Sequence, residues 1–436
     1  MDRDAVYQEN RIIVHRRQAA SHRLGASSVL HKQQNYPLKT RNAFMQWNQT
    51  RSLRTLLLTS LTLTSSLALA EEQTSKLDAF VRDAASKVMQ ENDIAGMAIA
   101  VTHNGQQQFF TYGNASKETG QPVTPDTLFE LGSISKTFTA TLASWAQATG
   151  QLSLNNSIDS YVPQLRDTRL GKVPVFHLGT HTAGGFPLQF PDKVQTAGQM
   201  MAYFKAWQPE YLPGTHRSYA NPSVGLLGLV AARSMKMPFD NAMQQRLFPA
   251  LGLKSTYLTV PQEQMSRYAQ GYNKLDEPVR VNPGVLASEA YGVKSSSRDV
   301  LSFVQANLGA DQYDAPLQHA LKNTRTGYFK VGAMTQDLIW EQYPMPVKLE
   351  TLLEGNASTM VLQAHKAEPI NPPLEALPDT WVNKTGSTNG FGGYVAFIPQ
   401  QQLGIVILAN KNYPNEARVK LAYQILDQVQ CQGCKR

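Results

Sequence analysis

Cysteine is scarce in this chain, because 436 residues contain only Cys431 and Cys434, within the C-terminal sequence CQGC. The body of the fold therefore has no disulfide bonds and must be stabilised by burial of apolar side chains. A Cys-x-x-Cys pair can be redox-active or bind a metal, but this one follows the last periodic segment and has no second pair. We interpret residues 431–436 as a tail whose two cysteines are suited to a local disulfide bond after export.

An excess of positive charge is also missing from most of the chain, although the formal net charge is +8. Residues 1–54 hold ten Lys and Arg against three Asp and Glu, and the remaining residues hold 31 against 30. No basic helix or patch is left there to attract DNA, RNA or an anionic membrane. The sequence therefore argues against nucleic acid as a partner.

After residue 70 the chain has no run of about 18 apolar residues, the length that a membrane-spanning helix needs. Before it, RSLRTLLLTSLTLTSSLALA has two arginines, a short apolar core rich in Ser and Thr, and a small-x-small exit, an order typical of a secretory signal. We predict a signal peptide over residues 45–70, a polar leader over 1–44 ahead of the better initiator Met45, and a periplasmic mature protein that begins near Glu71.

The apolar residues, which with the aromatics make up 42% of the chain, are arranged in periodic segments. Helical spacing occurs over residues 75–92 and again from Pro414 to about Gln428. Beside these segments lie AGMAIAV and QQFFTYG around the turn pair Asn104-Gly105, and WVNKTGS, GGYVAFIP and LGIVILAN near the C-terminus. The sequence predicts an α+β fold, in which both chain ends build one antiparallel sheet flanked by terminal helices, with a mainly helical middle. The predicted catalytic domain covers residues 71–430, with an α/β part at about 71–135 and 291–430 and a helical part at about 136–290.

The segment LGSISKTF, residues 131–138, contains a candidate nucleophile. Apolar residues at helical spacing follow it up to Gly150, so Ser133 is expected to open a core-facing helix with Lys136 on the same face. A helix N-terminus has unpaired N–H groups where an oxyanion would form. A serine at this position can equally be a simple helix cap, and this segment alone leaves both interpretations open.

Two further segments favour catalysis: Tyr219-Ala-Asn221 in RSYANPS, and Lys384-Thr-Gly386 on a predicted strand. A serine hydroxyl is a poor nucleophile until a neighbouring base takes its proton. A tyrosine, with an ordinary pKa of about 10, can be that base if two ammonium groups stabilise its phenolate. Lys136 and Lys384 can supply those charges; a neutral Lys136 is the alternative base, because coupled protons cannot be assigned from sequence.

Histidine is absent from these three segments. His177, His181 and His216 lie in the predicted helical middle, and we expect them to make structural hydrogen bonds. The glycine-rich NGFGG, residues 389–393, lacks the strand-then-helix setting of a phosphate loop and is interpreted as a hairpin turn. No metal, nucleotide or other cofactor is expected.

In this order, Ser-x-x-Lys, Tyr-x-Asn and Lys-Thr-Gly resemble the three motifs of the serine β-lactamase and penicillin-binding protein superfamily, and Tyr-Ala-Asn resembles class C. The similarity to class C cephalosporinases extends over about residues 75–428, through LFELGSISKTFTATLA, HTAGGFPLQFPD, PGTHRSYANPSVGLLG, EAYGVKSS, NKTGSTNGFGGYVAFIP and ILANKNYPNEARVKLAYQIL. The resemblance implies a monomeric hydrolase of β-lactam antibiotics that prefers cephalosporins, acts through a serine acyl-enzyme and confers resistance.

The resemblance also implies roles for individual residues. Ser133, Lys136, Tyr219 and Lys384 would be catalytic, and the N–H groups of Ser133 and Ser387 would form the oxyanion hole. The residues implied in substrate binding are Gln189, Asn221, Tyr291, Lys384, Thr385, Gly386, Asn415 and Arg418. The sequence departs from the usual pattern at DLIWE, where relatives often have Gly in place of Asp337 and Ile339, so the local loop geometry is expected to differ.

Two other functions are compatible with the motifs. A D-alanyl-D-alanine carboxypeptidase or serine esterase on the same scaffold would be acylated but would release β-lactams slowly, and a silent penicillin sensor would lack turnover. The extended match through HTAGGFPLQF and ILANKNYPN favours hydrolysis, because peptidases and esterases with the same motifs generally lose those flanks. The complete set of four catalytic residues argues against a silent sensor.

Overall fold

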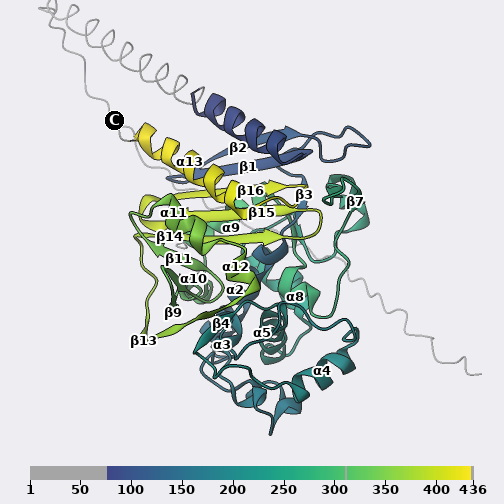
Figure 1. Ribbon diagram of the computed structural model, residues 1–436, viewed down its shortest axis with the longest axis vertical. Helices are drawn as coiled ribbons and strands as arrows, with labels where there is room; N and C mark the ends of the chain where they lie inside the picture. Colours follow the sequence, from purple (N-terminus) through teal and green to yellow (C-terminus); the bar gives the residue numbers. More distant parts are fainter. Residues whose placement is uncertain (1–75, 310–311, 434–436) are drawn as a thin grey trace, which may run out of the picture. The chain divides into compact units, whose positions relative to one another are not determined.

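The structure is a computed structural model that describes residues 76–309 and 312–433. Its largest element is an antiparallel nine-stranded sheet in the order β13-β9-β10-β11-β14-β15-β16-β1-β2 (Figure 1). The strands of this sheet are β1 (Gly96–His103), β2 (Gln106–Gly113), β9 (Gly327–Val331), β10 (Met334–Gln336), β11 (Glu341–Pro344), β13 (Glu368–Leu374), β14 (Thr380–Ser387), β15 (Gly392–Ile398) and β16 (Leu403–Ala409). The predicted leader, the predicted signal peptide and Cys434 lie outside the described residues.

The central strands are apolar without interruption because both faces of the sheet are covered. In β1, Met97 and Ile99 belong to one hydrophobic cluster, whereas Ala98 and Ala100 belong to the other. Successive side chains of a strand point to opposite faces, so each strand supplies both cores. The runs AGMAIAV and LGIVILAN therefore lack the alternation of a strand with one face in solvent.

Helices from the two ends of the described chain cover the same face of the sheet. The helix over residues 76–91 and α13 (Asn415–Gly433) contribute to the cluster that contains Met97 and Ile99 (Figure 1). The helix α9 (Ser297–Leu308) packs against β1, β15 and β16 from the opposite face. These contacts join segments that lie far apart in the sequence.

The chain between the two parts of the sheet is mainly helical, and three small sheets accompany the large one. Its helices and the later ones are α2 (Ser135–Ala148), α3 (Phe176–Gly179), α4 (Ala197–Ala206), α5 (Asn221–Ser234), α6 (Phe239–Ala242), α7 (Phe248–Ala250), α8 (Ala287–Tyr291), α10 (Ala315–Asn323), α11 (Leu349–Gly355) and α12 (Thr359–Leu362). The small sheets pair β3 (Leu128–Glu130), β8 (Lys294–Ser296) and β5 (Thr256–Tyr257); β12 (Ala364–Lys366) and β4 (His216–Ser218); and β6 (Gly271–Tyr272) and β7 (Pro278–Val279). Shorter helical turns are η1 (Gly132–Ile134), η2 (Ile158–Ser160), η3 (Pro163–Leu165), η4 (Leu170–Lys172), η5 (Met243–Leu247), η6 (Gln262–Arg267) and η7 (Pro399–Gln401).

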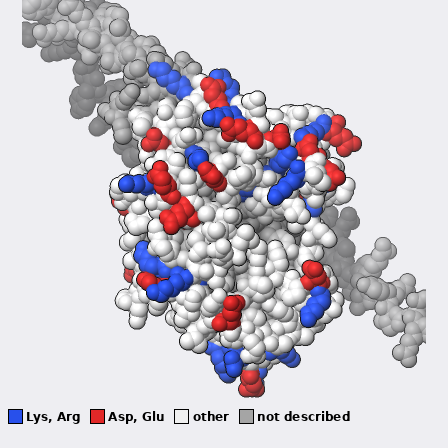
Figure 2. Space-filling view, viewed as in Figure 1, with Lys and Arg blue, Asp and Glu red and all other residues white. Residues whose placement is uncertain are grey.

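The predicted fold class is confirmed: one antiparallel sheet is built from both ends of the described chain, terminal helices flank it, and the middle is mainly helical. The exact division at residues 135 and 290 stays a prediction. Cys431 is exposed near the end of α13, which continues past the predicted end at Gln428. None of the described helices is long and apolar enough to cross a bilayer. On the face shown in Figure 2, Lys and Arg are interspersed with Asp and Glu.

Candidate active site

Ser133 lies in a tight turn just ahead of the helix that it was expected to open. Residues Gly132–Ile134 form the 3₁₀ turn η1, and α2 begins at Ser135. Gly132 has a φ of +53°, in the left-handed region that favours glycine. The turn leaves Ser133 on the wall of a cavity, while Lys136 lies one turn further along the chain.

The two serines of the segment have different surroundings. Ser133 Oγ accepts a hydrogen bond of 2.9 Å from Lys136 Nζ, which also donates to the carbonyl oxygen of Ala290 at 2.7 Å. Ser135 is fully buried, and its Oγ accepts the backbone N–H of Val293 at 3.0 Å. Ser133 is therefore the serine that combines a basic partner with access to the cavity.

Lys136 is completely buried beneath the serine. Burial disfavours the charged ammonium and lowers the pKa of Lys136 to about 8, although the neighbouring Tyr219 opposes the shift. A lysine with this pKa loses its proton close to neutral pH. It can therefore take part in proton transfer with Ser133 instead of acting only as a fixed charge.

Tyr219 is held between two ammonium groups, in the loop between β4 and α5. The Nζ atoms of Lys136 and Lys384 lie 5.3 and 5.1 Å from the centroid of its ring. Burial raises the pKa of Tyr219, but the charges of the two lysines outweigh burial and lower the pKa to about 8. The structure brings together the tyrosine and the two lysines that the sequence singled out.

Two buried residues that the sequence analysis missed complete the surroundings of Lys384. Arg217 Nη2 donates to Glu341 Oε1 at 3.0 Å, and Lys384 Nζ lies 3.9 Å from the same oxygen. The Arg217 guanidinium carbon lies 5.4 Å from the centroid of the Tyr219 ring. The signal available in the sequence for Arg217 was a charged residue two positions before Tyr219. For Glu341 the only signal was its place in DLIWE.

The end of β14 approaches η1 so closely that the contact requires glycine on both sides. A Cβ atom on Gly132 would lie 2.5 Å from Ser387 N, and one on Gly386 would lie 2.1 Å from Leu131 O. The backbone around Ser133 and that around Ser387 are consequently adjacent. This is the arrangement that two N–H groups need in order to face one oxyanion.

The cavity at this junction has a volume of about 600 Å³. The predicted site residues that line it are Ser133, Gln189, Tyr219, Asn221, Tyr291, Thr385, Gly386, Ser387 and Asn415. Lys136 and Lys384 are not among the lining residues, because they lie buried behind Ser133 and Tyr219. Asn221 Oδ1 is buried and has no hydrogen-bond partner among the described residues, so it is an acceptor that a substrate N–H could satisfy.

Arg418 occupies a different place from the one expected for it. It was expected to border the substrate, but it is fully buried and is not among the residues that line the cavity. Its Nη1 donates to Gly386 O at 2.8 Å and to Ser387 Oγ at 2.9 Å. Because these acceptors belong to the cavity wall, the structure places Arg418 as a support of that wall.

The three histidines make the hydrogen bonds expected of structural residues. His181 stacks on Tyr219 with 4.2 Å between ring centroids, and its Nδ1 accepts the N–H of Ala220 at 3.2 Å. Burial and the nearby cations lower the pKa of His181 well below its usual value, so its ring is neutral. His177 and His216 have ring nitrogens within 3.0 Å of threonine hydroxyl groups. Within the described residues, no three His, Cys, Asp or Glu side chains form a group that could hold a metal ion.

Comparison with known proteins gives the family. A family model described as "Beta-lactamase" matches residues 81–430. A β-lactamase of Pseudomonas fluorescens is 51% identical over 339 residues, which cover 78% of this chain and 95% of that protein. A class C β-lactamase solved in complex with cefoxitin has 51% identity and a TM-score of 0.79, covering 81% of this chain and 99% of that one. The chain belongs to the class C β-lactamases.

A structure described as a β-lactamase/D-alanine carboxypeptidase from Pseudomonas syringae is 74% identical to this class C β-lactamase. The TM-score of this match is 0.80, and the match covers 81% of this chain and 99% of the P. syringae chain. The family resemblance predicted from the three motifs is confirmed. The description of this neighbour names two activities, β-lactamase and D-alanine carboxypeptidase.

The segment DLIWE of this class C β-lactamase contains the loop between β10 and β11. Ile339 has a φ of +75°, where a β-branched residue is an outlier and glycine would be unstrained. Asp337 is fully buried, and neither of its carboxylate oxygens has a hydrogen-bond partner among the described residues. Burial raises the pKa of Asp337 well above its usual value, and the charge of Arg325 opposes the shift only in part.

Proposed function

We propose that the protein hydrolyses β-lactam antibiotics, with a preference for cephalosporins, through an acyl-enzyme on Ser133. The observation that carries this proposal is the hydrogen bond from Lys136 Nζ to Ser133 Oγ on the wall of a cavity that Tyr219 also lines. Acyl transfer needs a nucleophile, a group that takes and returns its proton, and hydrogen-bond donors for the oxyanion. Family membership and the extended match support the same reaction.

In the acylation step, Ser133 Oγ attacks the lactam carbonyl carbon while its proton passes to the pair formed by Lys136 and Tyr219. The oxyanion that forms accepts hydrogen bonds from the N–H groups of Ser133 and Ser387. The proton then moves from the pair to the lactam nitrogen as the C–N bond breaks. Because both pKa values are about 8, the pair can accept and donate the same proton near neutral pH.

In the deacylation step, a water molecule attacks the ester carbonyl carbon and gives its proton to Tyr219. The proton returns to Ser133 Oγ as the acyl group leaves, so the enzyme is regenerated without a cofactor. Lys384 keeps the phenolate accessible by its charge, since its Nζ lies 5.1 Å from the tyrosine ring. No step in this scheme requires a metal ion.

The remaining predicted residues are proposed to orient the substrate. Asn221 and Gln189 would bind the acyl side-chain amide, and the unpartnered Asn221 Oδ1 is a suitable acceptor for its N–H. Lys384 and Thr385 would attract the substrate carboxylate. The residues proposed to border the substrate are Tyr291, Gly386 and Asn415. Arg418 would act indirectly, by holding Ser387.

A D-alanyl-D-alanine carboxypeptidase is the second candidate, because the P. syringae neighbour is described by both activities. Steady-state turnover by the purified chain separates them. We expect fast, repeated hydrolysis of a chromogenic cephalosporin and slow cleavage of a D-alanyl-D-alanine peptide. A chain that is acylated once by the cephalosporin and cleaves the peptide faster would be a peptidase. A chain that turns over neither would be a sensor.

We also propose that the enzyme acts in the periplasm as a monomer. The signal-like order of residues 45–70 supports export to the periplasm. The monomer is what the resemblance to class C β-lactamases implies. The intact mass of protein recovered from a periplasmic extract should correspond to a chain that begins near Glu71. A dominant species that retains residues 45–70 would contradict export by cleavage, and a sedimentation mass twice that of the chain would contradict the monomer.

A further inference from the structure

A second cavity, of about 420 Å³, lies beside the proposed active site. Val281 and Tyr291 line both cavities, so they form a shared wall. On the far side of this wall the lining includes Arg280 and Lys294. None of the described residues that line the second cavity is an Asp or a Glu.

Arg280 is fixed in place but keeps unused hydrogen-bonding capacity. Its guanidinium carbon lies 4.1 Å from the centroid of the Tyr268 ring, and Nη2 donates to the carbonyl oxygen of Tyr268 at 2.9 Å. Nε is buried without a hydrogen-bond partner among the described residues. A guanidinium has five N–H donors, and the hydrogen bonds of this one to the carbonyl oxygens of Tyr268 and Ala269 come from Nη2 alone.

Lys294 also keeps a donor that no protein carbonyl takes. Its Nζ donates to the carbonyl oxygens of Leu258 and Gly292, both at 2.9 Å. An ammonium group has three N–H donors, which leaves one for a ligand. Burial lowers the pKa of Lys294, because the surrounding protein stabilises the charge less well than water does. An anion in the cavity would restore that stabilisation.

Two carboxylates act on Lys294 by their charge: Glu130, its partner on the neighbouring strand, and Asp240. Neither lines the second cavity. Glu130 accepts hydrogen bonds from the Tyr268 hydroxyl at 2.6 Å, from the N–H of Val281 at 2.8 Å and from the Thr388 hydroxyl at 2.6 Å. These bonds tie the segment that carries Arg280 to the proposed active site. The second cavity thus holds two cationic side chains, no lining carboxylate, and a wall in common with the cavity where the acyl side chain would lie.

We propose that this second cavity is a subsite for a carboxylate at the distal end of a substrate's acyl side chain, recognised by Arg280 and Lys294. The inference rests on the proposed function, because it takes the acyl group to be bound at Ser133. A side chain that passes Val281 and Tyr291 would bring its terminal carboxylate to the two cations. Charge-assisted hydrogen bonds of this kind are about twice as strong as neutral ones, so the subsite would act on specificity.

The test compares cephalosporins in matched pairs. Succinyl, glutaryl and adipyl acyl side chains are each prepared as the terminal carboxylate and as the terminal primary amide, which has nearly the same size and no charge. For at least one chain length, we expect kcat/KM to be about tenfold higher for the carboxylate, an effect typical of one charge-assisted hydrogen bond. The ratio of the two kcat/KM values does not depend on the fraction of folded enzyme.

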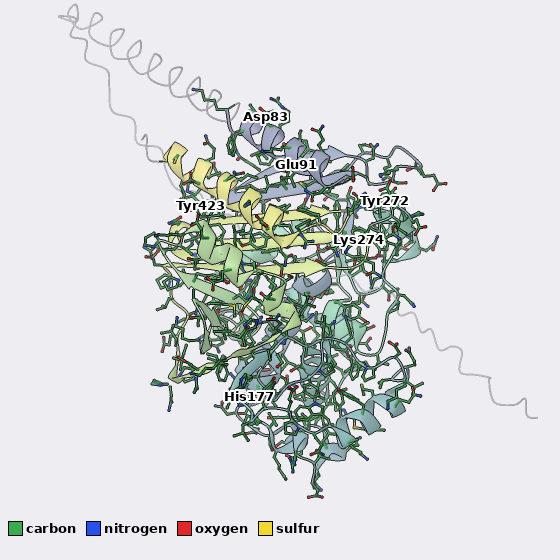
Figure 3. The ribbon with its side chains drawn as sticks, viewed as in Figure 1. Asp83, Glu91, His177, Tyr272, Lys274 and Tyr423 are labelled. Carbon is green, nitrogen blue, oxygen red and sulfur yellow. The ribbon has the colours of Figure 1, made fainter. Side chains whose placement is uncertain are left out.

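Three variants decide the assignment. Arg280→Met should reduce the carboxylate-to-amide ratio to about 1, and Arg280→Glu should invert it, because a carboxylate would then face a carboxylate. Lys294→Met should reduce the ratio by a smaller factor. Lys274→Met is the control: it removes the same charge from an exposed position on the neighbouring hairpin, outside both cavities, and should leave the ratio unchanged (Figure 3).

A ratio of about 1 in the wild type at all three chain lengths would overturn the subsite, as would a ratio that Arg280→Met leaves unchanged. Hydrolysis of both members at equal rates would contradict only the subsite and would leave the proposed function standing. Absence of turnover for both members would overturn both.

Discussion

Replacing Lys384 by methionine tests how the proposed base is activated. The substitution removes one of two ammonium groups beside Tyr219 while keeping a side chain of similar length. Lys384 Nζ lies 5.1 Å from the tyrosine ring centroid. For unit charges about 5 Å apart at an effective dielectric constant of about 20, Coulomb's law gives about 3 kcal/mol. This corresponds to an upward shift of about 2 pH units in the pKa of the tyrosine.

The sign of the kinetic effect follows from the same charges. In the wild type, kcat/KM should rise with pH through an inflection near 8, where the pair of Lys136 and Tyr219 loses a proton. In Lys384→Met the inflection should move up by about 2 units, so kcat/KM at pH 7 should fall about 100-fold. Loss of the like charge of Lys384 also raises the pKa of Lys136, which moves the inflection in the same direction.

The assay is the initial rate of hydrolysis of a chromogenic cephalosporin at low substrate concentration between pH 5 and 10. Lys411→Met is the control, since it removes a buried lysine that pairs with Asp276 and does not line the cavity. Its inflection should stay near that of the wild type. If Lys384→Met lowered the rate equally at every pH and left the inflection in place, Lys384 would act on the substrate alone and the reasoning would be refuted.

Three more predictions concern Tyr219 as the base, Asp337 in the DLIWE loop, and the close contact at Gly386. Tyr219→Phe should lose about 10²- to 10⁴-fold in turnover, and stopped-flow should show a burst of one equivalent before a slow steady state; full turnover would exclude Tyr219 as the base. Asp337 has a native pKa above its ordinary value of 3.8, so the wild type should lose stability as pH rises above that value. Relative to the wild type, Asp337→Asn should gain free energy of unfolding as pH rises above 3.8, by at most about 1.4 kcal/mol per pH unit; a constant difference in urea titrations would contradict this. Gly386→Ala places a Cβ 2.1 Å from Leu131 O, so it should cost about 1–3 kcal/mol in urea unfolding and reduce turnover, whereas wild-type values for both would contradict the close approach.

The sequence predicted those parts of the fold that depend on local pattern. The apolar runs of β1 and β16 and the helical spacing near both ends of the described chain are encoded by neighbouring residues, so their element types could be predicted. The boundaries were less exact: Ser133 lies in a turn two residues before α2 begins, and α13 extends to Gly433. The ends of helices depend on hydrogen bonds and packing that periodicity does not encode.

The site could be predicted where a motif carried it and not where a distant contact did. Ser133, Lys136 and Tyr219 stand in short patterns whose chemistry can be argued from residue type. The pair of Arg217 and Glu341 joins residues 124 positions apart, and no local pattern encodes such a contact. The buried place of Arg418 could not be predicted for the same kind of reason, because only the folded structure shows whether a side chain faces the cavity or lies behind its wall.

In the proposed reaction Ser133 becomes covalently acylated, and hydrolysis then releases the acyl group. The most direct measurement is intact-mass spectrometry after incubation with a slowly released β-lactam, followed over time in the wild type, Ser133→Ala and Ser135→Ala. One adduct should form and then decay in the wild type and in Ser135→Ala, even though the latter leaves the N–H of Val293 without its acceptor. No adduct should form in Ser133→Ala, and an adduct of the same mass in that variant would contradict acylation of Ser133.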